Sequence, residues 1–189
     1  MIETKEPTVF SEELLKRASK IKVLLTDVDG VLTDGRLYYL KDHENKAAEL
    51  KSFNSHDGLG LHFLNAAGVK TGVISGRISF ATEERARILK MTYVYQGHLE
   101  KIPLFEEVLA KEGIKAEEAA FIGDDFTDVP LMQRSGLGCA VADARPEVKE
   151  RAHFVSSKPG GRGAVREIAE LILKSQGQWE KVLAKYEML

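Results

Sequence analysis

The sequence has one cysteine, one tryptophan and no long apolar run. The single cysteine, Cys139, excludes a disulfide within the chain. Because it lies in an apolar run with no histidine nearby in the sequence, we expect a small buried residue there and not a catalytic thiol. No apolar run approaches the roughly 18 residues that a membrane-spanning helix needs. Disulfide-stabilised and membrane-spanning architectures are therefore not expected.

An excess of charge of either sign is also missing. Lys and Arg together number 27 against 29 for Asp and Glu, and the formal net charge is −2. This balance gives no reason to expect a nucleic acid or an anionic membrane as a partner. Residues 1–20 are rich in Glu and Lys and have no apolar segment like that of a signal peptide. We therefore expect a cytoplasmic protein.

Short apolar runs alternate with helical patterns along most of the 189 residues. Alternation of buried strands with helices predicts an α/β fold with a doubly wound, mostly parallel sheet, covered by helices on both faces. Ligands of such sheets bind at the carboxyl ends of the strands. The expected strands are residues 23–25, 69–74, 93–95, 119–122 and 138–141. The expected helices between them are residues 58–67, 80–89, 102–112, 129–135 and 146–151.

Glycines and a serine mark the ends of several helices. Ser11 is expected to cap a first helix over residues 11–20. Gly68, Gly113 and Gly136 each follow a predicted helix, where a left-handed residue often closes the last turn. These positions divide the chain into regular strand and helix units.

One stretch breaks the alternation. Residues 35–53 hold two apolar segments around a polar turn, which predicts a β-hairpin flap over the carboxyl edge of the sheet. The C-terminal part, residues 164–189, is expected to form two amphipathic helices divided near Gly177. The whole chain, residues 1–189, is expected to be a single domain with no large cap domain.

Two carboxylates, Asp27 and Asp29, leave the first predicted strand. In a continuing strand these positions share a face, and two close carboxylates repel unless a cation or a shared proton lies between them. Mg²⁺ takes oxygen ligands of this kind, and an aspartate can also attack phosphorus. Gly30 then allows a sharp turn beside a ligand. A simple polar turn is the alternative explanation for this segment alone.

Three more carboxylates, those of Asp124, Asp125 and Asp128, follow the fourth predicted strand. Asp128 could cap the next helix, but this explanation does not extend to the other two. The carboxyl ends of parallel strands share one edge of the sheet. We therefore expect this cluster to lie beside Asp27.

Two further features stand after predicted strands. The hydroxyl and amide of Ser75-Gly76-Arg77 could hold a phosphoryl oxygen, and the Arg77 guanidinium could pair with an anionic group of a substrate. Lys101, which opens a helix, could neutralise a phosphoryl group and Asp27. Taken alone, the first is better explained as a loop before a helix cap at Ser79, and the second as a solvated surface lysine.

Together the four features, in this order, resemble the motifs of the haloacid dehalogenase superfamily of phosphohydrolases. The resemblance covers about residues 21–172 and implies a Rossmann-like phosphatase. Its motifs match Asp27-Val28-Asp29-Gly30-Val31, Ser75, Lys101 and Gly123-Asp124-Asp125-Phe126-Thr127-Asp128.

The resemblance implies a role for each polar residue. Asp27 attacks phosphorus and becomes phosphorylated, while Asp29 protonates the leaving oxygen and then takes a proton from water. Mg²⁺ is bound by Asp27, the backbone carbonyl of Asp29 and Asp124. Ser75 and Lys101 bind the phosphoryl oxygens. The carboxylates expected to hold metal-bound waters or to orient the lysine are Asp125 and Asp128.

Six further segments of the chain are Leu32-Thr33-Asp34-Gly35, Phe53-Asn54, Asp57-Gly58-Leu59-Gly60, Ile74-Ser75-Gly76-Arg77, Tyr95-Gln96-Gly97 and Gly160-Gly161-Arg162-Gly163-Ala164-Val165-Arg166-Glu167. In these segments the chain is similar, more specifically, to the 3-deoxy-D-manno-octulosonate (KDO) 8-phosphate phosphatases of lipopolysaccharide synthesis. That group lacks a large cap and forms homotetramers in which hairpins and chain ends of neighbours help close the site. The similarity implies a phosphorylated sugar acid as substrate. Residues expected to contact it are Ser75, Gly76, Arg77, Asn54, Asp57, Gly58 and Arg162. Many members carry Arg where this chain has His56, which leaves phosphatases for nine-carbon sugar acid 9-phosphates as an alternative.

Two other classes remain in view. A receiver domain also uses a phosphorylated aspartate on a doubly wound sheet, but there the acidic pair follows the first strand and the phosphorylated aspartate a later one. Here the order is reversed. A catalytically inactive regulatory module on the phosphatase fold is the second alternative, and the presence of Asp27, Asp29, Lys101 and Asp124 argues against it.

Overall fold

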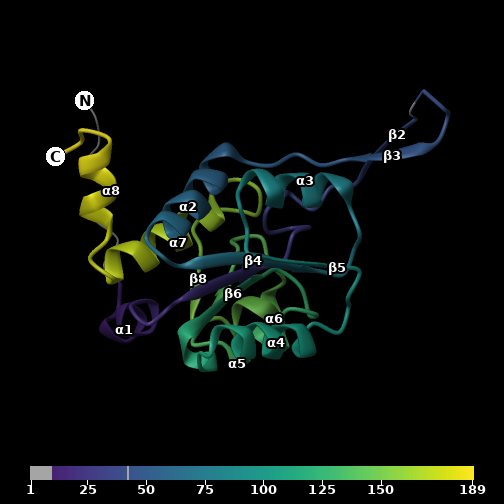
Figure 1. Ribbon diagram of the computed structural model, residues 1–189. Coiled ribbons are helices and arrows are strands. Elements are labelled where there is room, and N and C mark those ends of the chain that lie inside the picture. Colours follow the sequence, from purple (N-terminus) through teal and green to yellow (C-terminus); the bar gives the residue numbers. More distant parts are fainter. Residues whose placement is uncertain (1–9, 42) are drawn as a thin grey trace.

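The computed structural model describes residues 10–41 and 43–189, and a six-stranded parallel sheet forms its centre. The strand order is β5-β4-β1-β6-β7-β8, so the first strand of the chain lies between two neighbours in the middle of the sheet (Figure 1). The strands are β1 (Val23–Thr26), β4 (Lys70–Ser75), β5 (Tyr93–Gln96), β6 (Ala119–Gly123), β7 (Leu137–Ala140) and β8 (Phe154–Val155).

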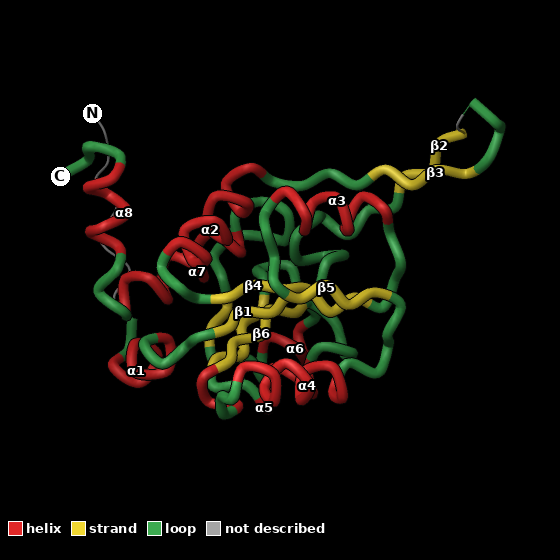
Figure 2. Tube along the Cα trace, in the orientation of Figure 1, coloured by secondary structure: helices red, strands yellow, loops and turns green. Residues whose placement is uncertain are grey.

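Helices cover both faces of this sheet, as the tube in Figure 2 shows. One face carries α2 (Ser55–Ala66), α3 (Phe80–Ile88) and α7 (Ala164–Ser175). The other carries α4 (Ile102–Glu112), α5 (Val129–Arg134) and α6 (Pro146–Lys149). A short helix, α1 (Glu12–Ala18), contacts α7 and begins at Ser11, whose Oγ accepts from the Leu14 amide at 3.2 Å. The predicted doubly wound α/β fold is confirmed, and no large cap stands over the described residues.

Burial explains why the sequence folds in this way. All four residues of β1 are buried, as expected for a central strand with helices on both faces. The last residue of β1, Thr26, pairs with Val73 of β4 on one side and with Ile122 of β6 on the other. This register brings the carboxyl ends of three strands to the same place on the sheet edge.

The predicted strands and helices are confirmed, with ends displaced by a few residues. β8 was not predicted, because two residues are too short for a periodicity to show. Gly68 and Gly113 have positive φ angles, as expected. The prediction for Gly136 is wrong, because this residue keeps an ordinary backbone conformation. A glycine is needed there for space, since a Cβ would lie 2.1 Å from the carbonyl oxygen of Glu117.

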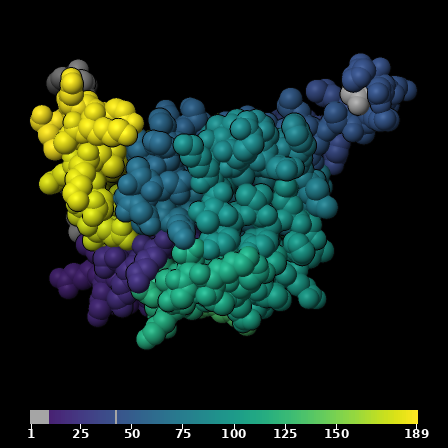
Figure 3. Space-filling model, in the orientation of Figure 1, coloured from purple at the N-terminus to yellow at the C-terminus, as the bar shows by residue number. Residues whose placement is uncertain are grey.

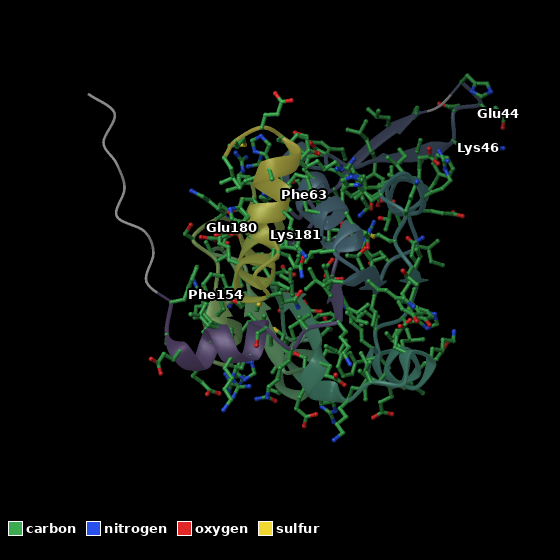
Figure 4. All side chains as sticks on the ribbon, turned by 60° about the vertical axis from the view of Figure 1, so that its left-hand side comes forward. Glu44, Lys46, Phe63, Phe154, Glu180 and Lys181 are labelled. Carbon is green, nitrogen blue, oxygen red and sulfur yellow. The ribbon has the colours of Figure 1, made fainter. Side chains whose placement is uncertain are left out.

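Two segments project from opposite ends of the molecule (Figure 3). One is the predicted hairpin, in which β2 (Tyr38–Lys41) pairs antiparallel with β3 (Ala47–Leu50). Its tip, marked by Glu44 and Lys46 in Figure 4, extends beyond the body, so only the root of the hairpin lies near the sheet edge.

The other projection is the C-terminal helix α8 (Trp179–Lys185). It packs on Phe63 of α2, which Figure 4 labels beside it. The ring centroid of Phe63 lies 6.4 Å from that of Trp179, at the start of α8, and 5.7 Å from that of Tyr186, just after its end. No helix in residues 10–41 or 43–189 is long and apolar enough to cross a membrane. Residues 1–9, part of the segment examined for a signal peptide, lie outside the described residues.

Candidate active site

Three strands deliver polar residues to one point on the carboxyl edge of the sheet. Asp27 follows β1, and its backbone amide donates to the carbonyl of Ile122 at 3.0 Å, so the ladder continues past the last strand residue. Asp124 follows β6, and Ser75 is the last residue of β4. The parallel register therefore produces the convergence that the sequence predicts.

Lys101 lies between two of these carboxylates. It immediately precedes α4, and its side chain is almost completely buried. Its Nζ lies 2.9 Å from Oδ1 of Asp27 and 2.7 Å from Oδ1 of Asp128. These two partners raise the pKa of Lys101 although burial alone would lower it. The lysine therefore stays a cation beside Asp27.

Asp128 links the second carboxylate cluster to this lysine. Its Oδ2 accepts from the backbone amides of Asp124 and Asp125 at 3.0 and 3.4 Å. Asp128 stands at the N-cap position of α5, as considered, but its side chain makes no capping hydrogen bond there and accepts instead from the amides of the preceding loop. With both oxygens occupied, it holds the loop and the lysine in place.

The carboxylates of Asp27, Asp124 and Asp128 offer oxygens that lie within 4.8 Å of one another. Burial, followed by repulsion from Asp128, raises the pKa of Asp27 to about 6 and that of Asp124 to about 8. Oδ1 of Asp124 is buried and has no hydrogen-bond partner among the described residues. Gly30 leaves room here, since a Cβ would lie 2.2 Å from Oδ2 of Asp124. Such a donor set fits a divalent cation that prefers oxygen ligands.

Asp125 does not join this group. It is exposed, and its Oδ1 accepts from the amide of Phe126 at 2.7 Å. In this structure the hydrogen-bonded carboxylate partners of Lys101 are Asp27 and Asp128. Of the two supporting carboxylates that we predicted, the structure brings Asp128 to the lysine and leaves Asp125 at the surface.

The side chain of Asp29 turns toward the root of the hairpin. Its Oδ1 accepts from Nζ of Lys51, and its Oδ2 lies 3.4 Å from Nε of Arg77. Lys51 and its neighbour Glu49 were missed by the sequence analysis. A signal was present, since two charged residues spaced by two share one face of a strand, but such pairs are usually solvated.

Arg77 reaches the same place from the loop after β4. Its Nη2 donates to Glu49 and, at 3.2 Å, to the hydroxyl of Tyr39. These hydrogen bonds raise the pKa of Arg77 further above its usual range. Ser75 is buried and its Oγ accepts from the Arg77 amide at 3.3 Å, while Gly76 leaves room for Leu99, which a Cβ would approach to 2.8 Å.

Two of the remaining predicted substrate residues, Asp57 and Asn54, make hydrogen bonds to the backbone. Asp57 is buried, and its two oxygens accept from the amides of Gly163 and Arg166 at the start of α7. Asn54 caps α2 through the His56 amide at 2.8 Å and donates to the carbonyl of Gly161. These two side chains hold backbone in place.

The surroundings of Gly58 and Arg162 are of another kind. A Cβ at Gly58 would meet the guanidinium of Arg85 at 2.3 Å, so the glycine serves packing of that arginine on α2. Arg162 is exposed, and with His56 and Arg166 it lines a shallow cavity at the start of α7. The loop that carries it is fixed to the first motif, because the Gly161 amide donates to the carbonyl of Val31 at 2.9 Å.

Comparisons with known proteins agree with this geometry. Residues 89–168 match the family model of haloacid dehalogenase-like hydrolases. The chain is 41% identical over 170 residues to the KDO 8-phosphate phosphatase of Yersinia pestis, which covers 90% of this chain and 89% of that protein.

Two solved structures are also similar. One is the KDO 8-phosphate phosphatase of Moraxella catarrhalis in complex with magnesium, phosphate and KDO, at 34% identity, with 94% of this chain and 99% of that chain covered and a TM-score of 0.88. The other is the cobalt-bound deoxy-D-mannose-octulosonate 8-phosphate phosphatase of Haemophilus influenzae, at 41% identity, with 85% and 92% covered and a TM-score of 0.79.

The sequence identity and the coverage establish the family relationship. The geometry agrees with it, because the buried Lys101 pairs with Asp27 beside an acidic cluster at the sheet edge. The chain belongs to the haloacid dehalogenase-like hydrolases, in the family of the KDO 8-phosphate phosphatases.

Proposed function

We propose that the protein hydrolyses KDO 8-phosphate to KDO and phosphate, with Mg²⁺ as cofactor and Asp27 as nucleophile. The observation that carries this proposal is the pairing of the Asp27 carboxylate with the buried cation Lys101, beside the unsatisfied carboxylate of Asp124. An unprotonated carboxylate held in this way is available to attack phosphorus. The relatives named above act on the same sugar phosphate.

The chemistry follows two half-reactions. In the first, a carboxylate oxygen of Asp27 bonds to phosphorus, the bond from phosphorus to the sugar oxygen breaks, and Asp29 gives that oxygen a proton. In the second, water attacks the phosphorus, Asp29 takes a proton from that water, and the bond between phosphorus and the Asp27 oxygen breaks, which releases phosphate. General acid and base catalysis of this kind contributes typically ~10²–10⁴-fold.

Asp27, Asp124 and the backbone carbonyl of Asp29 are the residues proposed to hold Mg²⁺. When bound, the cation would neutralise charge on the phosphoryl oxygens and relieve the repulsion among the carboxylates. Lys101 and Ser75 bind the phosphoryl oxygens, and the rigid support of Lys101 by Asp128 keeps that cation in place. Arg77, whose guanidinium carries five donors, is the proposed contact of the sugar carboxylate.

A homotetramer is part of the proposal. The hairpin carries exposed apolar side chains, with 44% of Leu37, 60% of Tyr39 and 55% of Leu40 accessible. Apolar side chains grouped on a projecting hairpin are typical of a contact surface. Neighbouring copies at this hairpin would lie near its root and so near Asp29 and Arg77.

The test is phosphate release with Mg²⁺ from purified protein and a small panel of substrates. The panel contains KDO 8-phosphate, a nine-carbon sugar acid 9-phosphate and simple hexose phosphates. We expect the highest kcat/KM for the eight-carbon acid. Preference for the nine-carbon acid would reassign the substrate and keep the mechanism, in line with His56 replacing an arginine. A protein that hydrolyses none of these esters would contradict the proposal and favour a regulatory role.

A further inference from the structure

Lys51 lies just after β3, at the root of the hairpin, and only 2% of its side chain is exposed. Its Nζ donates to Oδ1 of Asp29 and lies 3.4 Å from Oε1 of Glu49. Burying an unpaired ammonium group is very costly. The structure therefore holds this lysine in place by pairing it with carboxylates, and one of them is the proposed general acid and base.

Arg77 closes a ring of four charges at this place. Its Nη2 donates to Glu49 and its Nε lies 3.4 Å from Oδ2 of Asp29, so each carboxylate has both cations as neighbours. With both carboxylates ionised the ring has no net charge, and it carries one positive charge when Asp29 holds the proton that it gives to the leaving oxygen. Two of its members come from the hairpin, one from the loop after β1 and one from the loop after β4.

The ring determines where the Asp29 carboxylate lies. A carboxylate after a strand end has a free χ1 rotation, and cations on both of its oxygens restrict that rotation. Proton transfer needs the carboxyl within hydrogen-bond reach of the leaving oxygen. The position of the hairpin root therefore decides whether Asp29 can act.

We propose that Lys51 is a positioning residue, which holds the Asp29 carboxylate for proton transfer to the leaving oxygen and for proton uptake from water. This rests on the proposed phosphatase function and adds to it a residue outside the four motifs. Lys51 itself neither gives nor takes a proton in the reaction. The proton moves between Asp29 and the sugar oxygen in the first half-reaction, and between water and Asp29 in the second.

The experiment compares two leaving groups in the Lys51→Met variant. A sugar alkoxide needs a proton as it leaves, whereas nitrophenolate does not. We expect kcat for the preferred sugar phosphate to fall by about 10²-fold, which is the lower end of what general acid-base catalysis contributes. First-turnover release of nitrophenolate from p-nitrophenyl phosphate, followed by stopped flow, should change much less. KM for the sugar phosphate should remain close to that of the wild-type protein.

Three further proteins make the comparison complete. Lys51→Arg keeps a cation and should recover part of the lost kcat. Lys41→Met removes an exposed lysine from the same hairpin and should match the wild-type protein in both assays. The double variant Lys51→Met, Glu49→Gln restores charge balance, so it keeps the test valid where the single variant folds poorly.

Two results would overturn the proposal. If both esters lose rate equally, Lys51 supports the site as a whole and not proton transfer. If KM rises while kcat stays the same, Lys51 binds substrate directly. A wild-type protein without phosphatase activity would instead refute the proposed function, so the two failures are distinguishable.

Discussion

At the scale of single residues, the site concentrates negative charge that the protein alone compensates only in part. Lys101 is shared between Asp27 and Asp128, and Asp124 has no cationic hydrogen-bond partner among the described residues. Burial and mutual repulsion therefore raise the pKa values of Asp27 and Asp124. Carboxylates arranged in this way are unfavourable in isolation and suited to binding a divalent cation.

The first prediction concerns the nucleophile. Asp27→Asn replaces a carboxylate by an amide of nearly the same shape, which cannot attack phosphorus. We expect turnover to fall by about 10⁴-fold or more, as is usual when a nucleophile is lost, while circular dichroism and thermal unfolding show an intact fold. An Asp27→Asn protein with substantial activity in a phosphate-release assay would contradict the mechanism.

The second prediction concerns Asp124 and pH in the absence of metal. Because its folded pKa is raised to about 8, the folded protein keeps a proton that the unfolded chain releases near pH 4. The unfolded state then binds fewer protons, so the free energy of unfolding falls as pH rises from about 4 to about 8. Asp124→Asn removes this loss, and its Tm advantage over the wild-type protein should grow with pH over that range.

Thermal unfolding in EDTA between pH 5 and pH 8.5 gives the measurement, and repeating it with Mg²⁺ supplies the control. Mg²⁺ should stabilise the wild-type protein by mass action and leave Asp124→Asn nearly unchanged. A variant whose Tm follows the wild-type value at every pH in EDTA would show that Asp124 is not under electrostatic strain.

At the scale of elements, the start of α7 depends on Asp57. Its two oxygens accept from the amides of Gly163 and Arg166, at 3.2 and 2.8 Å. Asp57→Ala leaves two amides without this partner, at a cost of about 1–3 kcal/mol, and should lower Tm without changing KM. Asp57→Asn, which keeps one acceptor oxygen, should lie between. A large rise in KM with unchanged Tm would restore the predicted substrate contact.

The strands and helices around the site show what the sequence could and could not predict. Buried apolar runs and their flanking glycines identify β1, β4, β6 and the helices. Because the carboxyl ends of parallel strands lie at one edge of the sheet, Asp27, Asp124 and Lys101 are then expected to lie together. This part was predictable because it depends on local pattern and on one topological rule. The substrate contact of Asp57 is implied by the family resemblance and stays a prediction. Its hydrogen bonds to the start of α7 join residues 106 and 109 positions apart, so no local pattern could predict them.

The ring at the hairpin root could not be read from the sequence for a related reason. Glu49 lies in the hairpin strand β3 and Lys51 just after it, in a polar segment where charged residues are usually solvated. Their burial arises only when β3 returns to the sheet edge beside α3 and meets Asp29 and Arg77. The spacing of two places Glu49 and Lys51 on one face, but only the geometry of the loops after β1 and β4 and of the hairpin root brings that face against Asp29 and Arg77.

At the scale of the whole molecule, the two projections differ in what covers their apolar surface. α8 is stacked on its own chain, with Arg166 placed 4.9 Å from the ring centroid of Phe63 and 5.6 Å from that of Trp179. The hairpin instead extends into solvent with Tyr39 and Leu40 exposed. The exposed apolar side chains of the hairpin are therefore expected to contact another copy.

The last prediction tests that expectation. Leu40→Glu places a charge on the proposed contact, where burying it would cost far more than the apolar contact contributes, so sedimentation should show a smaller assembly than for the wild-type protein. Leu59→Glu, at an exposed apolar residue of α2, is the matched control away from the hairpin and the chain end, and should keep the wild-type mass. Because the hairpin root carries Lys51 and Glu49, loss of the assembly should also lower kcat. A wild-type protein that sediments as a monomer and is fully active would show that the hairpin positions Asp29 without any neighbour.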